Sequence, residues 1–571
     1  MAQSVTLPAG TLQGGICASL GEASYAGSNA SYFYSVPYAQ PPTGQLRFAP
    51  PQAYNGTLGQ ATTPAPSCPQ FGQQFTEPNQ SEDCLYLNIW VPANAKAGDK
   101  LPVKVWIYGG GNFAGSISNP TYNGCNLAAT GAIVVSINYR LGPLGFLGLQ
   151  SFGIGGNFGI QDQLLGLSWV QKNIQAFGGD PSKVMIFGES AGAVDVFTLG
   201  SLPQAPSLFQ GGVSESGGGR GLPPASSANA FGALWAQTIG CSDIACLRSK
   251  SLSELNITLS TVPNPNPGPS YNRNNVRSFG PFVDGNVIPA NPADAGMQVP
   301  FIFGSNSREY SLLLLSQPGV TSPAQITPAV YAAYLNSTFG RAASLVNNRY
   351  PVSAFSSAEF PAFEALVEVA TQTGFLCPAY QGLMRANQVG TPVWTYLWSQ
   401  APTCPWYNNF DASVLPIFGA AHTSEIPFVF GNTYNNPPPN GDCNFTAAEN
   451  SLSREFIGFW TGMASGNPGS QWPQFFTNSS MGLNVINGSS SATPGVVDYS
   501  VCSFWNQVNA TIFGTSTSNS TSTGSGSSGS RNSTSTTPAV ATYTGAAAFT
   551  IAKMPYMVGI ATLLGAYLSL G

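Results

Sequence analysis

Residues 184–192 read Val184-Met185-Ile186-Phe187-Gly188-Glu189-Ser190-Ala191-Gly192, and this stretch decides the fold. The apolar run before Gly188 predicts a buried strand, and residues 191–199 favour a helix. Gly-x-Ser-x-Gly at a sharp strand-to-helix turn is the pattern of a nucleophile elbow, in which a strained serine projects its hydroxyl. Gly188 and Gly192 omit side chains that would collide in the turn. Ser190 is the candidate nucleophile, although five-residue matches also arise by chance.

A glycine triplet lies upstream of this elbow, at the end of another predicted strand. Residues 103–108 are largely apolar, and Gly109, Gly110 and Gly111 follow them. Bare backbone N–H groups can approach a ligand closely, as the stabilisation of a tetrahedral oxyanion requires. A flexible turn is the alternative, and the position upstream of an elbow favours the oxyanion loop.

Strands and helices alternate around these two motifs. Residues 133–137 predict a buried strand, and a helical stripe from Leu164 to Phe177 follows it and stops at residues 178–181. Strand, loop, helix, strand, elbow and helix in this order are typical of a doubly wound α/β fold. Further strands are expected at residues 212–217, 301–304 and 393–398.

Two residues beyond the elbow are candidates to work with Ser190. Glu309 follows the strand at 301–304 and so belongs to the edge where α/β active sites form, although a lone glutamate is more often a surface charge. His422 is the one histidine of the chain. If the chain uses Ser–His chemistry, His422 is the imidazole base; the alternative is a structural histidine.

The chain carries few charges. Asp, Glu, Lys and Arg make up 8% of its 571 residues, against a usual share of about 25%. The net charge is −5 and no Lys/Arg cluster appears, which argues against nucleic acid as a partner. We expect N-linked glycans to keep the surface soluble, because Asn-x-Ser/Thr sequons recur. The sequons begin at Asn29, Asn55, Asn79, Asn256, Asn336, Asn444, Asn478, Asn487, Asn509, Asn519 and Asn532.

The ten cysteines indicate disulfides rather than a metal site. None forms a Cys-x-x-Cys pair, and with one histidine in the chain no metal site is expected. Cys68 and Cys84 bracket a short loop, and Cys241 and Cys246 are near enough for a local bridge. An even number of cysteines in a sequon-rich chain favours a secretory route. Residues 1–6 carry neither a basic nor an apolar segment, so we expect that a signal peptide has been removed.

The composition changes near the C-terminus, which predicts three parts. Residues 1–512 form the expected α/β domain. Residues 513–544 are rich in Ser, Thr and Gly and predict a disordered, O-glycosylated stalk. Residues 545–571 begin with small residues and end in an apolar tail, as in a GPI-anchor signal; a membrane-spanning helix is the rival interpretation. The sequence thus predicts a secreted protein held at the cell surface, with a membrane contact through this anchor alone.

The chain resembles the type-B carboxylesterase and cholinesterase-like family of α/β-hydrolases over residues 14–505. The motifs that carry the likeness are EDCLYLNIW at 82–90, YGGG at 108–111, NYRLGPLGF at 138–146, FGGDP at 177–181, FGESAG at 187–192, SESG at 214–217 and PFVDGNVIP at 281–289. The resemblance implies the α/β-hydrolase fold, with a large, mostly parallel mixed sheet flanked by helices. It also implies a carboxylic-ester hydrolase that needs no cofactor.

The resemblance assigns roles to the candidate residues. It implies Ser190 as nucleophile, His422 as base and Glu309 as the acid that orients the base, in the chain order expected for this fold. It places the oxyanion hole at the backbone N–H groups of Gly110, Gly111 and Ala191. Cys68–Cys84 and Cys241–Cys246 match disulfides of the family, and Cys17–Cys125, Cys377–Cys404 and Cys443–Cys502 are guesses for the remaining cysteines.

The chain departs from the family pattern in its glycine loop and in the short Cys68–Cys84 loop. Tyr108 takes the first position, which is His in other members, and Asn112 follows Gly111, displacing Phe113 by one. The Cys68–Cys84 loop has no Trp, so the cation–π contact that binds choline in cholinesterases is not expected. Its shortness also argues against a lipase that works at an oil interface.

We therefore predict a secreted or cell-surface serine esterase for small-molecule or lipid-like esters, working through an acyl-enzyme. A catalytically silent binding or adhesion protein on the same fold is the alternative from another class. The complete Ser, Glu and His set argues against it. A true lipase or a sterol or carotenoid esterase would differ in substrate only.

Overall fold

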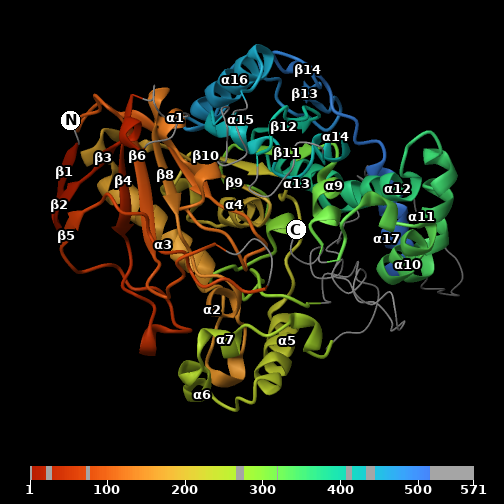
Figure 1. Ribbon diagram of the computed structural model, residues 1–571, viewed down its shortest axis with the longest axis horizontal. Helices are drawn as coiled ribbons and strands as arrows, with labels where there is room; N and C mark the ends of the chain where they lie inside the picture. Colours follow the sequence, from red (N-terminus) through yellow and green to blue (C-terminus); the bar gives the residue numbers. More distant parts are fainter. Residues whose placement is uncertain are drawn as a thin grey trace, which may run out of the picture.

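The computed structural model describes residues 3–20, 29–72, 77–264, 276–317, 319–406, 414–432 and 444–514. Its strands are β1 Ser4–Leu7, β2 Gly10–Gln13, β3 Gly15–Ile16, β4 Ala30–Pro37, β5 Leu58–Gln60, β6 Tyr86–Pro92, β7 Leu101–Ile107, β8 Ile133–Ile137, β9 Gly179–Glu189, β10 Gly211–Glu215, β11 Phe301–Asn306, β12 Val393–Trp398, β13 Met481–Val485 and β14 Thr493–Val496. In the described part of the chain, eleven strands form one sheet in the order β14-β13-β12-β11-β10-β9-β7-β8-β6-β4-β3, and β1, β2 and β5 form a small second sheet beside it (Figure 1).

The large sheet is mixed and mostly parallel. The strands from β13 to β8 in this order are all parallel to their neighbours. The two margins, β14 at one side and β6, β4 and β3 at the other, are antiparallel. The central strands are apolar on both faces because helices cover both, as parallel sheets require. The predicted fold class is confirmed.

Helices flank both faces of this sheet. They are α1 Cys125–Ala129, α2 Gly142–Phe146, α3 Phe158–Asn173, α4 Ala191–Ser201, α5 Ala225–Thr238, α6 Ile244–Ser249, α7 Leu252–Leu255, α8 Pro292–Ala295, α9 Glu309–Leu315, α10 Pro328–Phe339, α11 Ala343–Arg349, α12 Pro361–Thr371, α13 Cys377–Gln388, α14 Leu415–Phe418, α15 Ile426–Phe430, α16 Ala447–Met463 and α17 Cys502–Phe513. A π-helical turn at Gln372–Leu376 joins α12 to α13.

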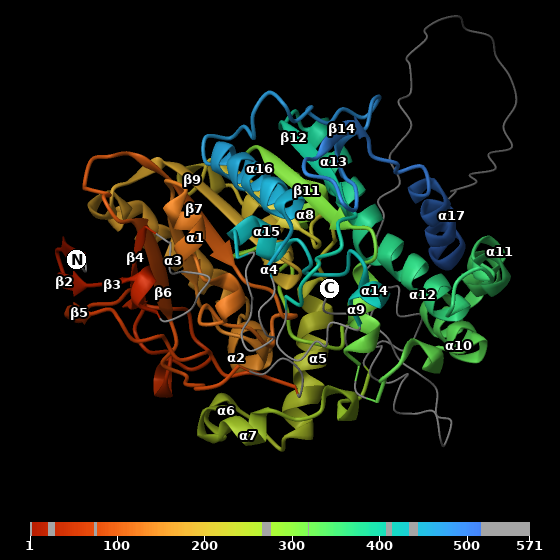
Figure 2. The ribbon, with the colours of Figure 1, turned by 45° about the horizontal axis from the view of Figure 1, so that its top comes forward.

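Side-chain contacts show that α4 and α16 lie on opposite faces. Phe303 of β11 packs against Phe197 of α4, with ring centroids 5.8 Å apart. Its neighbour Gly304 is in register with Tyr396 of β12, and Tyr396 contacts Trp460 of α16 at 6.0 Å. Because successive residues of a strand point to opposite faces, the two helices sandwich the sheet between them. Figure 2 shows α16 in front of the strands of the sheet.

The predicted spans agree with the structure in type and differ at their ends. Residues 133–137 and 393–398 are β8 and β12, and the predicted helical stripe is α3 followed by a 3₁₀ turn at Ile174–Phe177. The predicted break at 178–181 is shorter than expected, because Gly178 alone, at φ 93°, reverses the chain and β9 begins at Gly179. A glycine in this left-handed region ends a helix at little steric cost.

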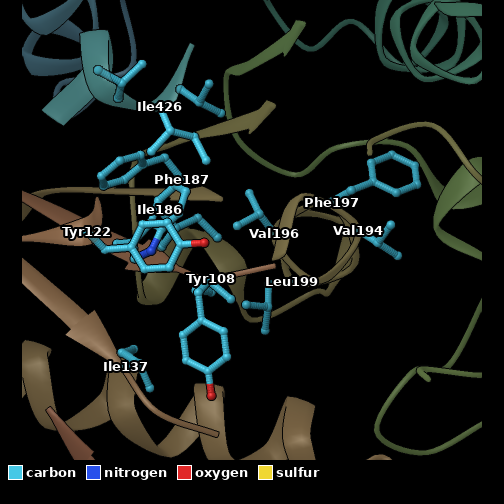
Figure 3. Packing of buried hydrophobic residues seen from close by; sticks show 14 of the residues in the cluster. Tyr108, Tyr122, Ile137, Ile186, Phe187, Val194, Val196, Phe197, Leu199 and Ile426 are labelled. Atoms are coloured by element: carbon cyan, nitrogen blue, oxygen red, sulfur yellow. The ribbon is translucent and has the colours of Figure 1, made fainter. Parts of the chain in front are cut away.

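Apolar residues on both sides of the elbow bury it in the core. Figure 3 shows Ile186 and Phe187 of β9 lying close to Tyr108 and to Val196 and Leu199 of α4. All five side chains are at most 1% exposed. Burying each such side chain stabilises the fold by roughly 1.5–3 kcal/mol. This packing offsets the strain of the turn at Ser190.

Four disulfides are defined in the described residues, and they correct part of the predicted pairing. Cys17–Cys125, Cys68–Cys84 and Cys241–Cys246 form as expected. Cys377–Cys404 and Cys443–Cys502 were wrong, because Cys377, the first residue of α13, bonds to Cys502, the first residue of α17. The physical reason is that α17 packs beside α13, although the two cysteines are 125 residues apart in the chain. Cys404 is also disulfide-bonded, and Cys443 lies outside the described residues.

The predicted C-terminal parts fall almost wholly outside the described chain. Helix α17 ends at Phe513, one residue beyond the predicted end of the α/β domain. The predicted stalk from residue 515 onward and the predicted anchor at 545–571 are not described, so both stay predictions. Within the described ranges, none of the helices has the length and apolar character needed to cross a membrane.

Candidate active site

The predicted elbow forms at the junction of β9 and α4. Ser190 lies between them at φ 59° and ψ −125°, a strained backbone for a residue with a side chain. A Cβ on Gly192 would lie 2.1 Å from the carbonyl oxygen of Ile107, and one on Gly188 would lie 2.6 Å from the same oxygen. The two glycines therefore let the turn pack directly against the end of β7, which is the reason the sequence needs them.

The glycine loop after β7 lies against this turn. A Cβ on Gly109 would lie 2.8 Å from Ser190 Cβ. Gly110 and Gly111 have φ 102° and 67°, and the Gly110 carbonyl accepts the N–H groups of Phe113 and Ala114 at 3.2 and 3.0 Å. Within the described chain, the N–H groups of Gly110, Gly111 and Ala191 donate to no acceptor. The structure thus leaves three backbone N–H donors of the described chain without an acceptor, two in the glycine loop and one at the first residue of α4.

Glu309 and His422 form a buried pair. Glu309 is the first residue of α9 and is fully buried, so the surface-charge alternative is wrong. Its Oε2 lies 2.7 Å from His422 Nδ1, and its Oε1 accepts the Asn306 N–H at 2.7 Å. The backbone N–H of His422 also donates to the backbone carbonyl of Glu309 at 3.3 Å. These contacts fix the carboxylate and the imidazole relative to one another.

The other imidazole nitrogen faces the elbow. His422 Nε2 lies 3.0 Å from Oε1 of Glu189, the residue before Ser190. The geometry of this contact is not that of a hydrogen bond, and Nε2 has no hydrogen-bond partner in the described chain. The ring of Phe375, in the π-helical turn, packs on the imidazole with centroids 4.9 Å apart. The structure brings Glu309 and His422 to the elbow, and the direct contact there is with Glu189 rather than with the Ser190 hydroxyl.

Three further carboxyl groups without a predicted role form a buried cluster with Glu309, and one of them, Glu189, contacts His422. They are Glu189, Glu215 at the end of β10, and Glu425, each at most 1% exposed. Burial raises the pKa of Glu189 and of Glu215 well above the ordinary value, and neighbouring carboxylates add to this effect. Burial and Glu309 raise the pKa of Glu425 to about 8. These shifts favour the neutral acid form beside the imidazole.

Side-chain hydrogen bonds hold Glu215 and Glu425 in place. Trp460 Nε1 donates to Glu215 Oε1 at 2.9 Å, and Asn306 Nδ2 donates to Glu425 Oε2 at 2.5 Å. The signal in the sequence was that Glu189, Glu215 and Glu425 each stand inside or beside a motif already singled out. No sequence pattern predicted that these three glutamates would meet, because they come from three separate segments.

The profile of the carboxylesterase family matches residues 1–505. The chain belongs to the carboxylesterase family. Para-nitrobenzyl esterase from Bacillus subtilis is 33% identical over 465 residues, which cover 77% of this chain and 88% of that protein. Cocaine esterase from Homo sapiens is 33% identical over 514 residues, with 81% and 85% covered. Acetylcholinesterase from Bungarus fasciatus is 32% identical over 524 residues, with 84% and 82% covered.

Family membership and these relatives identify the chain as a carboxylic-ester hydrolase with the α/β-hydrolase fold. The predicted family, fold and enzyme class are thus confirmed. A small-molecule ester is the substrate class that fits the family.

Proposed function

We propose that this carboxylesterase-family protein is a serine hydrolase that works through an acyl-enzyme on Ser190. The observation that carries the proposal is the position of His422. Its Nδ1 is 2.7 Å from the Glu309 carboxyl, and its Nε2 faces the residue beside the elbow serine. An imidazole that is oriented by an acid on one side, and whose other nitrogen has no hydrogen-bond partner in the described chain and lies at the residue before a serine, supports a role in general-base catalysis.

Each step follows from this arrangement. His422 takes the proton of Ser190 as the serine oxygen attacks the ester carbonyl, and Glu309 stabilises the imidazolium. The N–H groups of Gly110, Gly111 and Ala191 hold the oxyanion, each worth about 3 kcal/mol. The alcohol leaves with the proton from His422. Water then attacks the acyl-enzyme by the same route and releases the acid.

Replacement of the nucleophile tests the proposal. Ser190→Ala is expected to lower the kcat for a short p-nitrophenyl ester by about 10⁴-fold or more and to abolish labelling by a fluorophosphonate probe. Ser216→Ala is the matched control, because Ser216 also follows a strand at positive φ, is buried, and has a hydroxyl without a partner. Turnover that survives in Ser190→Ala would reject the assignment, and a wild-type protein without labelling would support the silent binding protein instead.

We also propose that the protein is secreted and N-glycosylated. The described disulfides support an oxidising compartment, and eight of the nine described sequon asparagines are exposed. Asn509, buried in α17, is the exception. Mass spectrometry after enzymatic deglycosylation should find the exposed sites modified and Asn509 unmodified. Release of the protein from cells by a phosphatidylinositol-specific phospholipase tests the GPI anchor.

A further inference from the structure

A hydrogen-bonded carboxyl group links the proposed oxyanion loop to the helix of the nucleophile. Asp195 lies five residues after Ser190 in α4 and is fully buried. Its Oδ1 accepts the Asn112 Nδ2–H at 3.3 Å, and its Oδ2 accepts the Gln163 Nε2–H at 2.6 Å. Asn112 directly follows Gly111, whose N–H is a proposed oxyanion donor.

We propose that Asp195 is a positioning residue that holds the oxyanion loop through Asn112, and that proton uptake by its carboxyl loosens this hold and lowers turnover. The inference rests on the proposed function, because it concerns the donors that would stabilise the oxyanion at Ser190.

The loop needs such an anchor at its middle. Asn112 has φ 59°, and Gly110 and Gly111 before it are also at positive φ, so three successive residues take left-handed backbone. The two glycines take this backbone at little cost, but a residue with a side chain, such as Asn112, keeps it only when the surroundings hold it. The Asn112 carbonyl accepts the Gly142 N–H at 2.6 Å, and Tyr139 Oη donates to the Tyr108 carbonyl at 2.7 Å. Among these ties, the Asn112 side chain alone joins the loop to α4, which also carries Ser190.

The network can exist in two forms. As a carboxylate, Asp195 accepts from both amides at once. The amide oxygens Asn112 Oδ1 and Gln163 Oε1 are buried and have no hydrogen-bond partner. A protonated Asp195 carries one O–H donor, which is satisfied when one of these amides turns its oxygen toward it. Proton uptake therefore changes which atoms face Asp195, and the Asn112 side chain is one of the two groups that must respond.

The electrostatic surroundings of Asp195 bring the pKa of its carboxyl into the pH range in which the enzyme can be assayed. No cation forms an ion pair with Asp195 in the described chain, and burial raises its pKa to about 7 in spite of the two amides. The titratable groups that face it are Tyr108 at the end of β7 and Tyr139 after β8, and burial raises the pKa of both phenols, so they stay neutral. On α3 the residue before Gln163 is Asp162, whose carboxylate is paired with Arg140 at 2.7 Å.

The pH dependence of kcat tests the proposal. In the wild type, proton uptake by Asp195 adds to the loss of activity that protonation of the general base causes. Because the tie to Asn112 is worth about 10- to 100-fold rather than all activity, log kcat should fall on the acid side with a slope that exceeds one over a limited pH range. Asp195→Asn is isosteric and cannot titrate, and it should show a slope near one. Asp195→Ala should lower kcat about 10- to 100-fold with KM within about twofold, because oxyanion donors act mainly in the transition state.

Three comparisons make the test decisive. Asn112→Ala should lower kcat like Asp195→Ala, and the double variant should be no worse than either, because both remove the same tie. Glu449→Gln removes another buried acid, one that caps α16 through Thr446, and it should keep the wild-type slope. Thermal unfolding checks that Asp195→Asn is folded at every pH used.

The outcomes separate the two proposals. If Ser190→Ala keeps its turnover, the proposed function and this inference both fall. If Ser190→Ala is inactive while Asp195→Asn shows the wild-type slope, the inference alone is overturned. It is also overturned if Asn112→Ala keeps wild-type kcat, since Asp195 would then have no route to the loop.

Discussion

Lys104 and Asp195 are buried on opposite faces of the central sheet, and neither belongs to an ion pair in the described chain. Lys104 of β7 points toward α16 and donates one hydrogen bond to the Ile457 carbonyl at 3.1 Å. Asp195 of α4 accepts two hydrogen bonds from amides. Burial lowers the pKa of Lys104 to about 7 and raises the pKa of Asp195 to about 7.

The difference lies in what each group is tied to. In the described chain, Lys104 hydrogen-bonds to the backbone of the covering helix α16 and to none of the residues of the proposed site. Asp195 is tied to Asn112 in the oxyanion loop. Burying either group lowers the stability of the fold, since removing a charge from water is unfavourable for either sign. Under our proposal, Asp195 but not Lys104 also contributes to turnover. The predictions below test this contrast, from the largest effect to the smallest.

The largest effect is expected at Glu309, a buried acid that, unlike Asp195, does contact a titratable partner, His422. Glu309→Gln should lower kcat by about 10³- to 10⁴-fold, because an amide cannot stabilise the imidazolium and favours the wrong tautomer. Steady-state kinetics on a soluble ester measures this, with Glu449→Gln as the control at wild-type rate. A loss smaller than tenfold would remove Glu309 from the proposed mechanism.

The second effect is on stability at Asp195. Because its folded-state pKa of about 7 lies above the unfolded value of about 3.9, the folded state keeps the proton longer, and the free energy of unfolding falls as pH rises from about 4 to 7. Asp195→Asn removes this fall. We expect it to raise the free energy of unfolding by about 4 kcal/mol at pH 8 and by little near pH 4, measured by urea unfolding. A destabilised Asp195→Asn at pH 8 would contradict this.

The third effect is on stability at Lys104, with the opposite sign of pH dependence. Its folded-state pKa of about 7 lies below the unfolded value of about 10.4, so the free energy of unfolding rises with pH between these values. Lys104→Met should add about 2 kcal/mol at pH 7, after the loss of the hydrogen bond to Ile457. The gain should vanish near pH 10, and kcat should not change; a changed kcat would break the contrast with Asp195.

The smallest effect is the coupling between the two sites. The sheet separates Lys104 from Asp195, and they share no partner, so the stability changes of Lys104→Met and Asp195→Asn should add to within about 0.5 kcal/mol. A double-variant cycle, with each free energy of unfolding measured in urea, gives the interaction energy between the two substitutions. A larger coupling would show that the two buried charges act on each other through the sheet.

The elbow is the part of the site that local sequence predicts best. Gly188, Ser190 and Gly192 are adjacent in the chain, and the turn they form depends on backbone sterics within a few residues. The same holds for the glycine loop and for the Cys241–Cys246 bridge, because loops this short allow few geometries. His422 and Glu309 could be proposed because one histidine is present and because strand ends of an α/β sheet meet at one edge.

Other features depended on distant segments and were beyond a local pattern. The contact of His422 with Glu189 joins residues 233 positions apart, as the two numbers show. The cluster of Glu189, Glu215 and Glu425 has the same origin, and so does the Cys377–Cys502 bridge that replaced a predicted pairing. A lysine inside an apolar strand and an aspartate in an apolar helix give no sign in the sequence of how deeply they are buried.

By itself, the sequence determined the alternation of strands and helices, the strained turn at Ser190 and the candidate groups for the chemistry, because periodicity and glycine sterics act over a few residues. Only the tertiary structure decided which acids gather beside His422 and Glu309, which cysteines pair across the fold, and that Asp195 meets Asn112. Those facts depend on how segments more than a hundred residues apart, or on different layers, pack in three dimensions, and on the desolvation that this packing imposes on their charges.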